Sequence, residues 1–326
     1  MTSVYPARDR TAWIKAQRPP RGAAPDPTRP HGVFLEDEPL ASGAIASTGV
    51  VLLTNKECPW HCLMCDLWKD TTTRRVPVGA IPQQLDFALE TWRKAGATPR
   101  QLKLYNSGSF FDAQAIPPDD YPAIAQKIAF AQNIVVECHP RLIGDRTLRL
   151  RDLLAGSLEV AIGLETAHAE ILERLNKQFD LADFARAAGF LRDHGVALRA
   201  FLLVNPPFLD EAGGLAWVVK SAAFAFDCGA TAVSLIPTRT GNGAMKRLLA
   251  AGEFTPPTLA TLERAQQTAL ALKRGRVFAD TWDLEAFSRC PQCFDARVER
   301  LRSMNLSQLN QPPIACTACG SGDSQA

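Results

Sequence analysis

The feature that most constrains this 326-residue chain is the grouping of its nine cysteines. Seven of the nine fall into three tight groups, within residues 58–65, 290–293 and 316–319. The first residues are polar and Pro-rich, with no apolar core of a signal peptide. Because disulfides are rare in a reducing compartment, we expect a cytoplasmic protein whose clustered thiols bind metal or iron–sulfur.

Composition narrows the class of protein further. Apolar residues make up 46% of the chain and charged residues 21%, the usual range for a globular protein. The net charge of +2 excludes a polybasic, histone-like protein but leaves room for a local basic patch. No apolar run approaches the ~18 residues that span a bilayer, so we expect no membrane contact.

From residue 49 onward, short apolar segments alternate with longer amphipathic ones. The apolar segments lack polar alternation, which is typical of parallel strands buried on both faces. Six strand–helix units predict an α/β fold with right-handed crossovers, and six are too few for an eightfold barrel. We therefore predict an open, TIM-like partial (β/α)6 barrel. The strand candidates are 50–54, 101–105, 133–137, 159–163, 198–204 and 232–236, and the helix candidates are 82–95, 118–131, 147–155, 181–194, 210–227 and 257–273.

Composition also divides the chain into three regions. Residues 1–30 hold six Pro, six basic and two acidic residues, so 1–48 is predicted to be a mobile polar arm followed by a short cap. An arm that binds nucleic acid is the alternative for this segment. Residues 49–278 form the predicted barrel. Residues 279–326 hold four cysteines and little periodicity, which predicts a small metal-stapled module.

The first cysteine group follows the first predicted strand of the barrel directly. Cys58, Cys62 and Cys65 have the spacing C-x3-C-x2-C, at the edge of the sheet where ligand loops gather in α/β folds. Soft thiolates favour iron–sulfur or zinc, and a structural zinc needs a fourth ligand that the loop lacks unless His61 supplies it. A zinc knuckle therefore remains the alternative to an iron–sulfur cluster with one open iron.

In this position the loop resembles the signature of the radical SAM superfamily, where it follows the first strand of a partial (β/α)6 barrel. The resemblance implies that the three cysteines hold a [4Fe–4S] cluster whose open iron binds S-adenosylmethionine (SAM). It further implies that a donor such as flavodoxin or ferredoxin supplies the electron that cleaves SAM to a 5′-deoxyadenosyl radical, which abstracts hydrogen from the substrate. Met64 stands where the superfamily usually has an aromatic residue.

The same resemblance implies that loops after the later strands contact SAM. After the fourth strand, Gly-Leu-Glu-Thr at 163–166 is similar to a motif of radical SAM subfamilies close to the elongator catalytic subunit and the tRNA methylthiotransferases. A nearby basic residue would pair with the methionyl carboxylate; Lys177 is the candidate and Arg199 its rival. The full set of expected SAM contacts is Asn106, Ser107, Gly108, Ser109, Glu137, Glu165, Thr166, Lys177 and Arg199.

Three phrases narrow the resemblance: Asn-Ser-Gly-Ser-Phe-Phe-Asp at 106–112, Cys-Asp-Leu-Trp at 65–68, and the Gly-Leu-Glu-Thr motif. Together they resemble the radical SAM lyases that complete archaeosine on transfer RNA, and their bacterial relatives. This resemblance implies a lyase or transferase that acts on a modified nucleobase in tRNA. The alternatives are a radical SAM enzyme for a peptide or small metabolite, and a non-catalytic metal-binding scaffold.

The C-terminal cysteines form two C-x2-C pairs. Cys290, Cys293, Cys316 and Cys319 suit one tetrahedral zinc ion, with a helix near 295–304 between the pairs. A second iron–sulfur cluster is the alternative.

Overall fold

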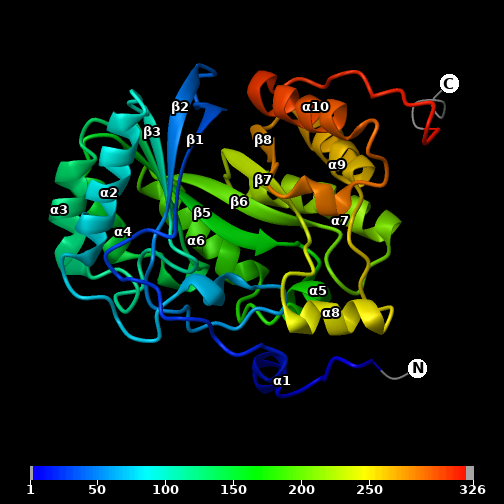
Figure 1. Cartoon of the computed structure of the whole chain (residues 1–326), viewed down its shortest axis with the longest axis horizontal. Helices are drawn as coiled ribbons and strands as arrows, with labels where there is room; N and C mark the ends of the chain where they lie inside the picture. Colours follow the sequence, from blue (N-terminus) through cyan, green and yellow to red (C-terminus); the bar gives the residue numbers. More distant parts are fainter. Residues whose placement is uncertain (1–2, 321–326) are drawn as a thin grey trace.

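One sheet of eight strands, arranged in chain order, forms the centre of the protein (Figure 1). The computed structural model describes residues 3–320. β1 (Gly32–Pro39) pairs antiparallel with β2 (Ile45–Leu52), and each later strand lies parallel to its predecessor. The later strands are β3 (Gln101–Tyr105), β4 (Asn133–Glu137), β5 (Ser157–Glu165), β6 (Ala197–Val204), β7 (Ala232–Pro237) and β8 (Arg276–Ala279).

Helices connect the parallel strands and cover the outer face of the curled sheet (Figure 1). The predicted partial α/β barrel is confirmed, and each of the six predicted strand–helix pairs is present. The α-helices are α1 (Arg10–Ala16), α2 (Ala80–Lys94), α3 (Tyr121–Lys127), α4 (Asp145–Leu153), α5 (Ala169–Arg174), α6 (Leu181–Asp193), α7 (Glu211–Asp227), α8 (Gly243–Ala250), α9 (Leu259–Ala271) and α10 (Phe294–Ser307). Short 3-10 helices are η1 (Leu67–Asp70), η2 (Pro118–Asp120), η3 (Pro140–Leu142) and η4 (Leu284–Phe287).

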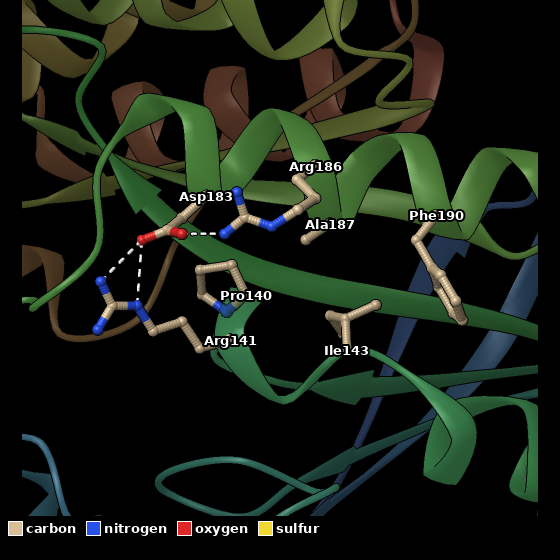
Figure 2. A pocket seen from close by; sticks show the side chains of 7 residues that line it. All are labelled: Pro140, Arg141, Ile143, Asp183, Arg186, Ala187 and Phe190. Atoms are coloured by element: carbon tan, nitrogen blue, oxygen red, sulfur yellow. Dashed lines mark hydrogen bonds and ion pairs between the residues drawn. The ribbon is translucent and has the colours of Figure 1, made fainter.

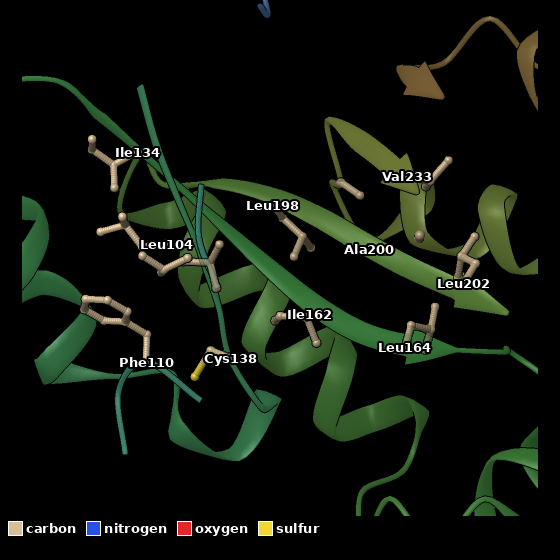
Figure 3. Packing of buried hydrophobic residues seen from close by; sticks show 14 of the residues in the cluster. Leu104, Phe110, Ile134, Cys138, Ile162, Leu164, Leu198, Ala200, Leu202 and Val233 are labelled. Atoms are coloured by element: carbon tan, nitrogen blue, oxygen red, sulfur yellow. The ribbon is translucent and has the colours of Figure 1, made fainter. Parts of the chain in front are cut away.

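Alternate residues of the parallel strands form the main apolar core on the outer face of the sheet. Leu104, Ile134, Ile162 and Leu202 are almost fully buried there, beneath the surrounding helices (Figure 3). Burying each side chain of this size contributes about 1.5–3 kcal/mol to the stability of the fold. Buried strands therefore need apolar residues, which is why these segments could be predicted as strands from those residues alone.

The inner face of the sheet is different, because charged side chains fill it near the amino ends of the strands. Arg199 donates from Nε to Glu159 at 2.5 Å and also pairs with Glu38. Arg276 bonds Glu159 at 2.8 Å, and Lys103 pairs with Glu38. We call these five residues the charged floor. Each is buried or nearly so. Their three cations and two carboxylates close this end of the barrel, and Glu36, which Lys103 also bonds at 2.6 Å, balances the remaining positive charge.

Residues 3–48 are more closely joined to the barrel than their composition indicates. Tyr5 and Ile14 are buried in a second apolar cluster, and β1 adds a strand to the sheet. Arg10 donates to the carbonyl of Glu173 at 3.1 Å. The prediction of a mobile arm rested on proline and charge content, which does not reveal that these few apolar side chains and arginines find partners on the barrel.

The C-terminal region is also continuous with the sheet. Asn305 and Gln308, at the end of α10, use their side-chain amides to bond the backbone of Ala279 and Val277 in β8 at 2.7–3.1 Å. These bonds satisfy the outer edge of β8, which an edge strand would otherwise leave open to another chain. The last residues of the predicted module, 321–326, lie outside the described residues.

Within residues 3–320, none of the helices combines the length and apolar character needed to cross a membrane.

Candidate active site and metal centre

The loop that carries Cys58, Cys62 and Cys65 lies at the carboxyl edge of the sheet, between β2 and η1. Two asparagines hold its backbone in place. Asn242 donates from Nδ2 to the carbonyls of Leu63 and Cys65, at 2.8 and 3.0 Å, and Asn176 donates to the carbonyl of His61 at 2.7 Å. The loop is therefore fixed by the segments that follow β7 and α5, two elements remote from it in sequence.

The N-terminal segment holds the other side of this loop. Arg18 and Arg21 both pair with Glu57, the residue before Cys58, and Arg21 also donates to the carbonyl of Trp68 at 2.6 Å. Arg18 and Arg21 lie over the Trp68 ring, with 4.7 and 5.2 Å between guanidinium carbon and ring centre. These two arginines could not be predicted from the sequence, because nothing local distinguishes them from the other basic residues of 1–30.

The loop after β3 packs directly against the cysteine loop. A Cβ on Gly108 would lie 3.2 Å from the Cβ of Cys58, so the glycine permits this close approach. Glu137, at the end of β4, accepts hydrogen bonds from the backbone N–H of Asn106 at 2.6 Å and of Gly108 at 3.4 Å. Burial raises the pKa of Glu137, although these N–H groups oppose the shift. The Glu137 carboxylate thus shapes the loop, which includes Ser107 at a left-handed φ of 53°.

Asn106 stands out because its side chain is fully buried and neither its Oδ1 nor its Nδ2 has a partner within the described part of the chain. Leaving such a group unsatisfied costs about 1–3 kcal/mol. A polar ligand beside the cysteine loop would satisfy both atoms, so this amide fits a binding site.

Glu165 and Lys177 form a buried ion pair beside the three thiols, with 2.6 Å between Oε1 and Nζ. Glu165 has a φ of 66° and lies at a register shift of β5, an irregularity that redirects a side chain. Burial raises the pKa of Cys65 to about 12 and the neighbouring Cys62 adds to the rise, whereas the Lys177 charge opposes it. The pair therefore supplies a cation and an acceptor at the same edge as the cysteines.

His139 connects this pair to the cysteine loop. Its ring stacks on Trp60 with 3.7 Å between ring centres, and its Nε2 lies 2.9 Å from the carbonyl of Lys177. The ring Nδ1 of His139 accepts from the backbone N–H of Arg141 at 3.3 Å. The backbone N–H of His139 donates to Ser109 Oγ at 3.0 Å. Burial lowers the pKa of His139 to about 4, so the ring is neutral at physiological pH and Nε2 is the donor.

Most of the predicted SAM contacts thus meet around the cysteine loop. Thr166, which follows Glu165, is buried and its Oγ1 accepts from the backbone N–H of His168 at 3.1 Å. Arg199 lies elsewhere, five residues before the end of β6, and its bonds go to the charged floor. The sequence shows that a residue is basic but not whether it faces a ligand or an ion pair. It therefore could not distinguish Arg199, on β6, from Lys177, in the segment after α5.

The four C-terminal cysteines form a second centre. Their sulfur atoms all lie within 4.8 Å of one another; Cys290 and Cys316 are 4.0 Å apart, and Cys293 and Cys319 are 3.9 Å apart. A tetrahedral ion with bonds of about 2.3 Å places its sulfurs about 3.8 Å apart. Arg297 donates from Nε to Cys293 Sγ at 3.3 Å. The donor set therefore fits one thiolate-bound metal ion.

Comparison with known proteins gives relatives over nearly the whole chain, although no family model matches it. The chain is 25% identical to archaeosine synthase subunit beta of Methanosarcina acetivorans, across 90% of this chain and 88% of that protein. It is 23% identical to an uncharacterized protein of Methanocaldococcus jannaschii, across 89% and 85% of the two chains. A 139-residue stretch is 30% identical to archaeosine synthase subunit beta of Thermococcus kodakarensis, covering 40% and 43%.

Among solved structures, the fold matches that of the archaeal Elp3 of Methanocaldococcus infernus with a TM-score of 0.52 and 15% identity. The match covers 68% of this chain and 59% of that one, so it spans less than two thirds of Elp3 and shows a shared fold. The relatives confirm the resemblance to the archaeosine-forming proteins, and the match to Elp3 shows a shared fold.

Proposed function

We propose that this protein is a radical SAM enzyme that acts on a modified nucleobase in tRNA. The observation that carries the proposal is the placement of three thiols on one loop, beside the buried Glu165–Lys177 pair, at the carboxyl edge of a partial barrel. Three soft donors on one loop suit a [4Fe–4S] cluster with one open iron. The unsatisfied amide of Asn106 supports a polar ligand at the same place.

In this proposal, Cys58, Cys62 and Cys65 hold the cluster, which with SAM supplies a 5′-deoxyadenosyl radical when an electron arrives from a donor such as flavodoxin or ferredoxin. Lys177 offers its ammonium to the methionyl carboxylate, and Glu165 accepts from the amine or the ribose hydroxyls. Asn106, Ser107, Gly108, Ser109 and Thr166 line the same site. Glu137 acts on the ligand through the loop that it shapes. We assign the carboxylate contact to Lys177 and not to Arg199, because the floor already engages Arg199.

Two curated relatives support the nucleobase substrate, since both are named archaeosine synthase subunit beta. Whether the reaction completes as a lyase or a transferase depends on the substrate, and the lyase is favoured by the phrases at 106–112 and 163–166. The clustered thiols suit the reducing cytoplasm, where we place the protein.

At the C-terminal centre we propose zinc. The two sulfur separations near 3.9 Å match one tetrahedral ion, whereas a cubane spreads its thiolates farther apart because each sits on a different iron. Arg297 compensates part of the negative charge of the thiolates and links them through Glu263 to α9.

Anaerobic reconstitution with iron and sulfide tests the proposal. We expect about four iron and one zinc per chain, and 5′-deoxyadenosine on reduction with SAM. The C62A variant is expected to keep its zinc, to lose most of the iron and to form no 5′-deoxyadenosine. Wild-type protein that binds four iron and still forms none, with bulk tRNA present or absent, would favour the metal-binding scaffold. A content of about eight iron per chain would show that the C-terminal cysteines hold a second iron–sulfur cluster and not zinc.

A further inference from the structure

A cavity of about 470 Å³ opens on the surface between η3 and the first turns of α6 (Figure 2). Arg141 and Arg186 border it at one end, and Phe190 and Ile143 line the other. Ligand pockets in proteins commonly have volumes of 300–1,000 Å³, so the size suits a single nucleotide or another small group. None of the contacts assigned to SAM or to the cysteine loop uses this cavity.

One carboxylate holds both arginines in position. Asp183 accepts from Arg141 Nε at 3.1 Å and Nη2 at 3.0 Å through one oxygen, and it pairs with Arg186 through the other. The Asp183 side chain is 11% exposed, whereas those of Arg141 and Arg186 are 54% and 68% exposed. The guanidinium groups are therefore fixed on their inner side and open to solvent on their outer side.

This arrangement leaves donors for an anion. A guanidinium has five N–H groups, and Asp183 engages only some of those on each arginine. Two arginines and one carboxylate carry a net charge of +1, which matches the single negative charge of a phosphodiester. Because Asp183 already orders both side chains, less entropy is lost when an anion binds.

The far wall of the cavity is apolar. Phe190 and Ile143 are half-buried and present a ring and a branched aliphatic side chain at the opposite end of the cavity from the arginines (Figure 2). Any of the nucleic-acid bases can stack on an aromatic side chain, so this contact depends little on the RNA sequence. A charged end beside an apolar wall suits a nucleotide better than it suits a free inorganic ion.

The cavity also lies close to the candidate active site. The backbone N–H of Arg141 donates to His139, and the ring of His139 stacks on Trp60, between Cys58 and Cys62. A nucleotide in the cavity would thus be bound near the loop that holds the cluster.

We infer that this cavity binds one nucleotide of the RNA substrate outside the reacting centre, with the phosphodiester on Arg141 and Arg186 and the base on Phe190. This inference rests on the proposed function, because it takes the substrate to be RNA. The contact would position the RNA backbone and carry no base specificity.

The test is filter binding of bulk tRNA to the reconstituted protein over a range of salt concentrations. The R141A/R186A double variant is expected to bind more weakly and to lower the slope of log K against log[salt] by about one, as expected for one lost phosphate contact. F190A is expected to weaken binding at least ~5-fold and to leave the slope unchanged, since stacking involves no ion release.

Matched controls separate the cavity from general surface charge. Arg93 is 72% exposed and pairs with Glu90 three residues before it, much as Arg186 pairs with Asp183, but it lies on α2. R93A and F130A, which removes an exposed aromatic ring elsewhere, are expected to bind tRNA like the wild type. Melting temperatures confirm that all variants fold.

The outcomes distinguish this inference from the proposed function. Without RNA, reductive formation of 5′-deoxyadenosine is expected to be the same in R141A/R186A and wild type. If both proteins form none, with or without bulk tRNA, the result counts against the proposed function. If wild-type protein forms 5′-deoxyadenosine but R141A/R186A binds tRNA with the wild-type slope, the cavity is not an RNA site. Salt-insensitive or undetectable tRNA binding by wild-type protein overturns the inference as well.

Discussion

At the scale of single residues, the absence of a side chain at Gly163 allows the Glu165–Lys177 pair to form. A Cβ built on Gly163 would lie 2.4 Å from Glu165 Oε1 and 2.7 Å from Lys177 Nζ. Both atoms are the far ends of flexible side chains, so they could move away at little cost to folding. The glycine is therefore required by the position of the charges and not by the backbone of β5.

The variant Gly163→Ala tests this point. We expect it to change the free energy of unfolding by less than about 1 kcal/mol, while SAM affinity falls at least ~10-fold, because a displaced pair loses its alignment with the ligand. Isothermal titration of SAM into reconstituted protein, together with thermal melting, measures both. Gly189→Ala, on the outside of α6 with its nearest contact at 3.9 Å, is the matched control and should keep wild-type SAM affinity. An unchanged affinity in Gly163→Ala would argue against SAM binding at this pair.

The residues of this site differ in how well they could be predicted from the sequence. The three cysteines were identifiable because their spacing is local and their chemistry is specific. Glu137 was identified by its position at a strand end, but the structure uses its carboxylate to hold backbone N–H groups. The arginines of the N-terminal segment carried no local signal, since their partners lie far away in the sequence.

At the scale of elements, the cysteine loop is held by the start of α8. Asn242 performs two tasks there: its Oδ1 accepts from the N–H of Met245 and caps the helix, while its Nδ2 bonds the carbonyls of Leu63 and Cys65. A single side chain thus couples the loop after β7 to the loop after β2.

Replacing Asn242 with Ser separates these two tasks. Serine retains an N-cap oxygen but has no amide to reach the two carbonyls. We expect α8 and the melting temperature to change little, whereas the reconstituted variant should lose iron to a chelator several-fold faster. Asp210→Ser, at the exposed cap of α7, provides the control and should keep the wild-type rate. Equal rates of iron loss in all three proteins would mean that Asn242 does not stabilise the loop.

At the scale of the whole molecule, the charged floor joins five strands of the sheet, β1, β3, β5, β6 and β8. Burial alone would raise the pKa of Glu38, but the charges of Arg199 and Lys103 outweigh it and hold that pKa well below its usual range. The floor therefore loses stability as the pH falls and the carboxylates gain protons, and it keeps its full contribution near neutral pH.

The variant Arg199→Met distinguishes a role of Arg199 in the charged floor from the contact with the SAM carboxylate that was the alternative for this residue. Removing the guanidinium leaves Glu38 and Glu159 buried with fewer partners, which should cost about 3–5 kcal/mol of unfolding free energy. The SAM affinity of the folded fraction should stay within about twofold of wild type. Denaturant unfolding and SAM titration at 10 °C measure the two effects. A large loss of SAM affinity with unchanged stability would instead assign Arg199 to the SAM carboxylate.

The sequence by itself determined the order of the parallel strands, the helices between them and both cysteine centres. These features depend on neighbouring residues: an apolar run long enough for a buried strand, a helical period, or thiols a few residues apart. β1 and β8 were not predicted, because β1 carries three acidic residues, among them Glu38 of the charged floor, and β8 has only four residues.

Only the tertiary structure decided which charged and polar residues meet. Arg199 reaches Glu38 across 161 positions of the chain, and Asn242 reaches Leu63 across 179. Such contacts depend on the curl of the sheet, which brings strand ends and loops together irrespective of their separation in sequence. The sequence pattern therefore does not distinguish the roles of these polar side chains. Only the folded barrel decides which of them forms a structural ion pair, which holds the cysteine loop and which is a candidate ligand contact.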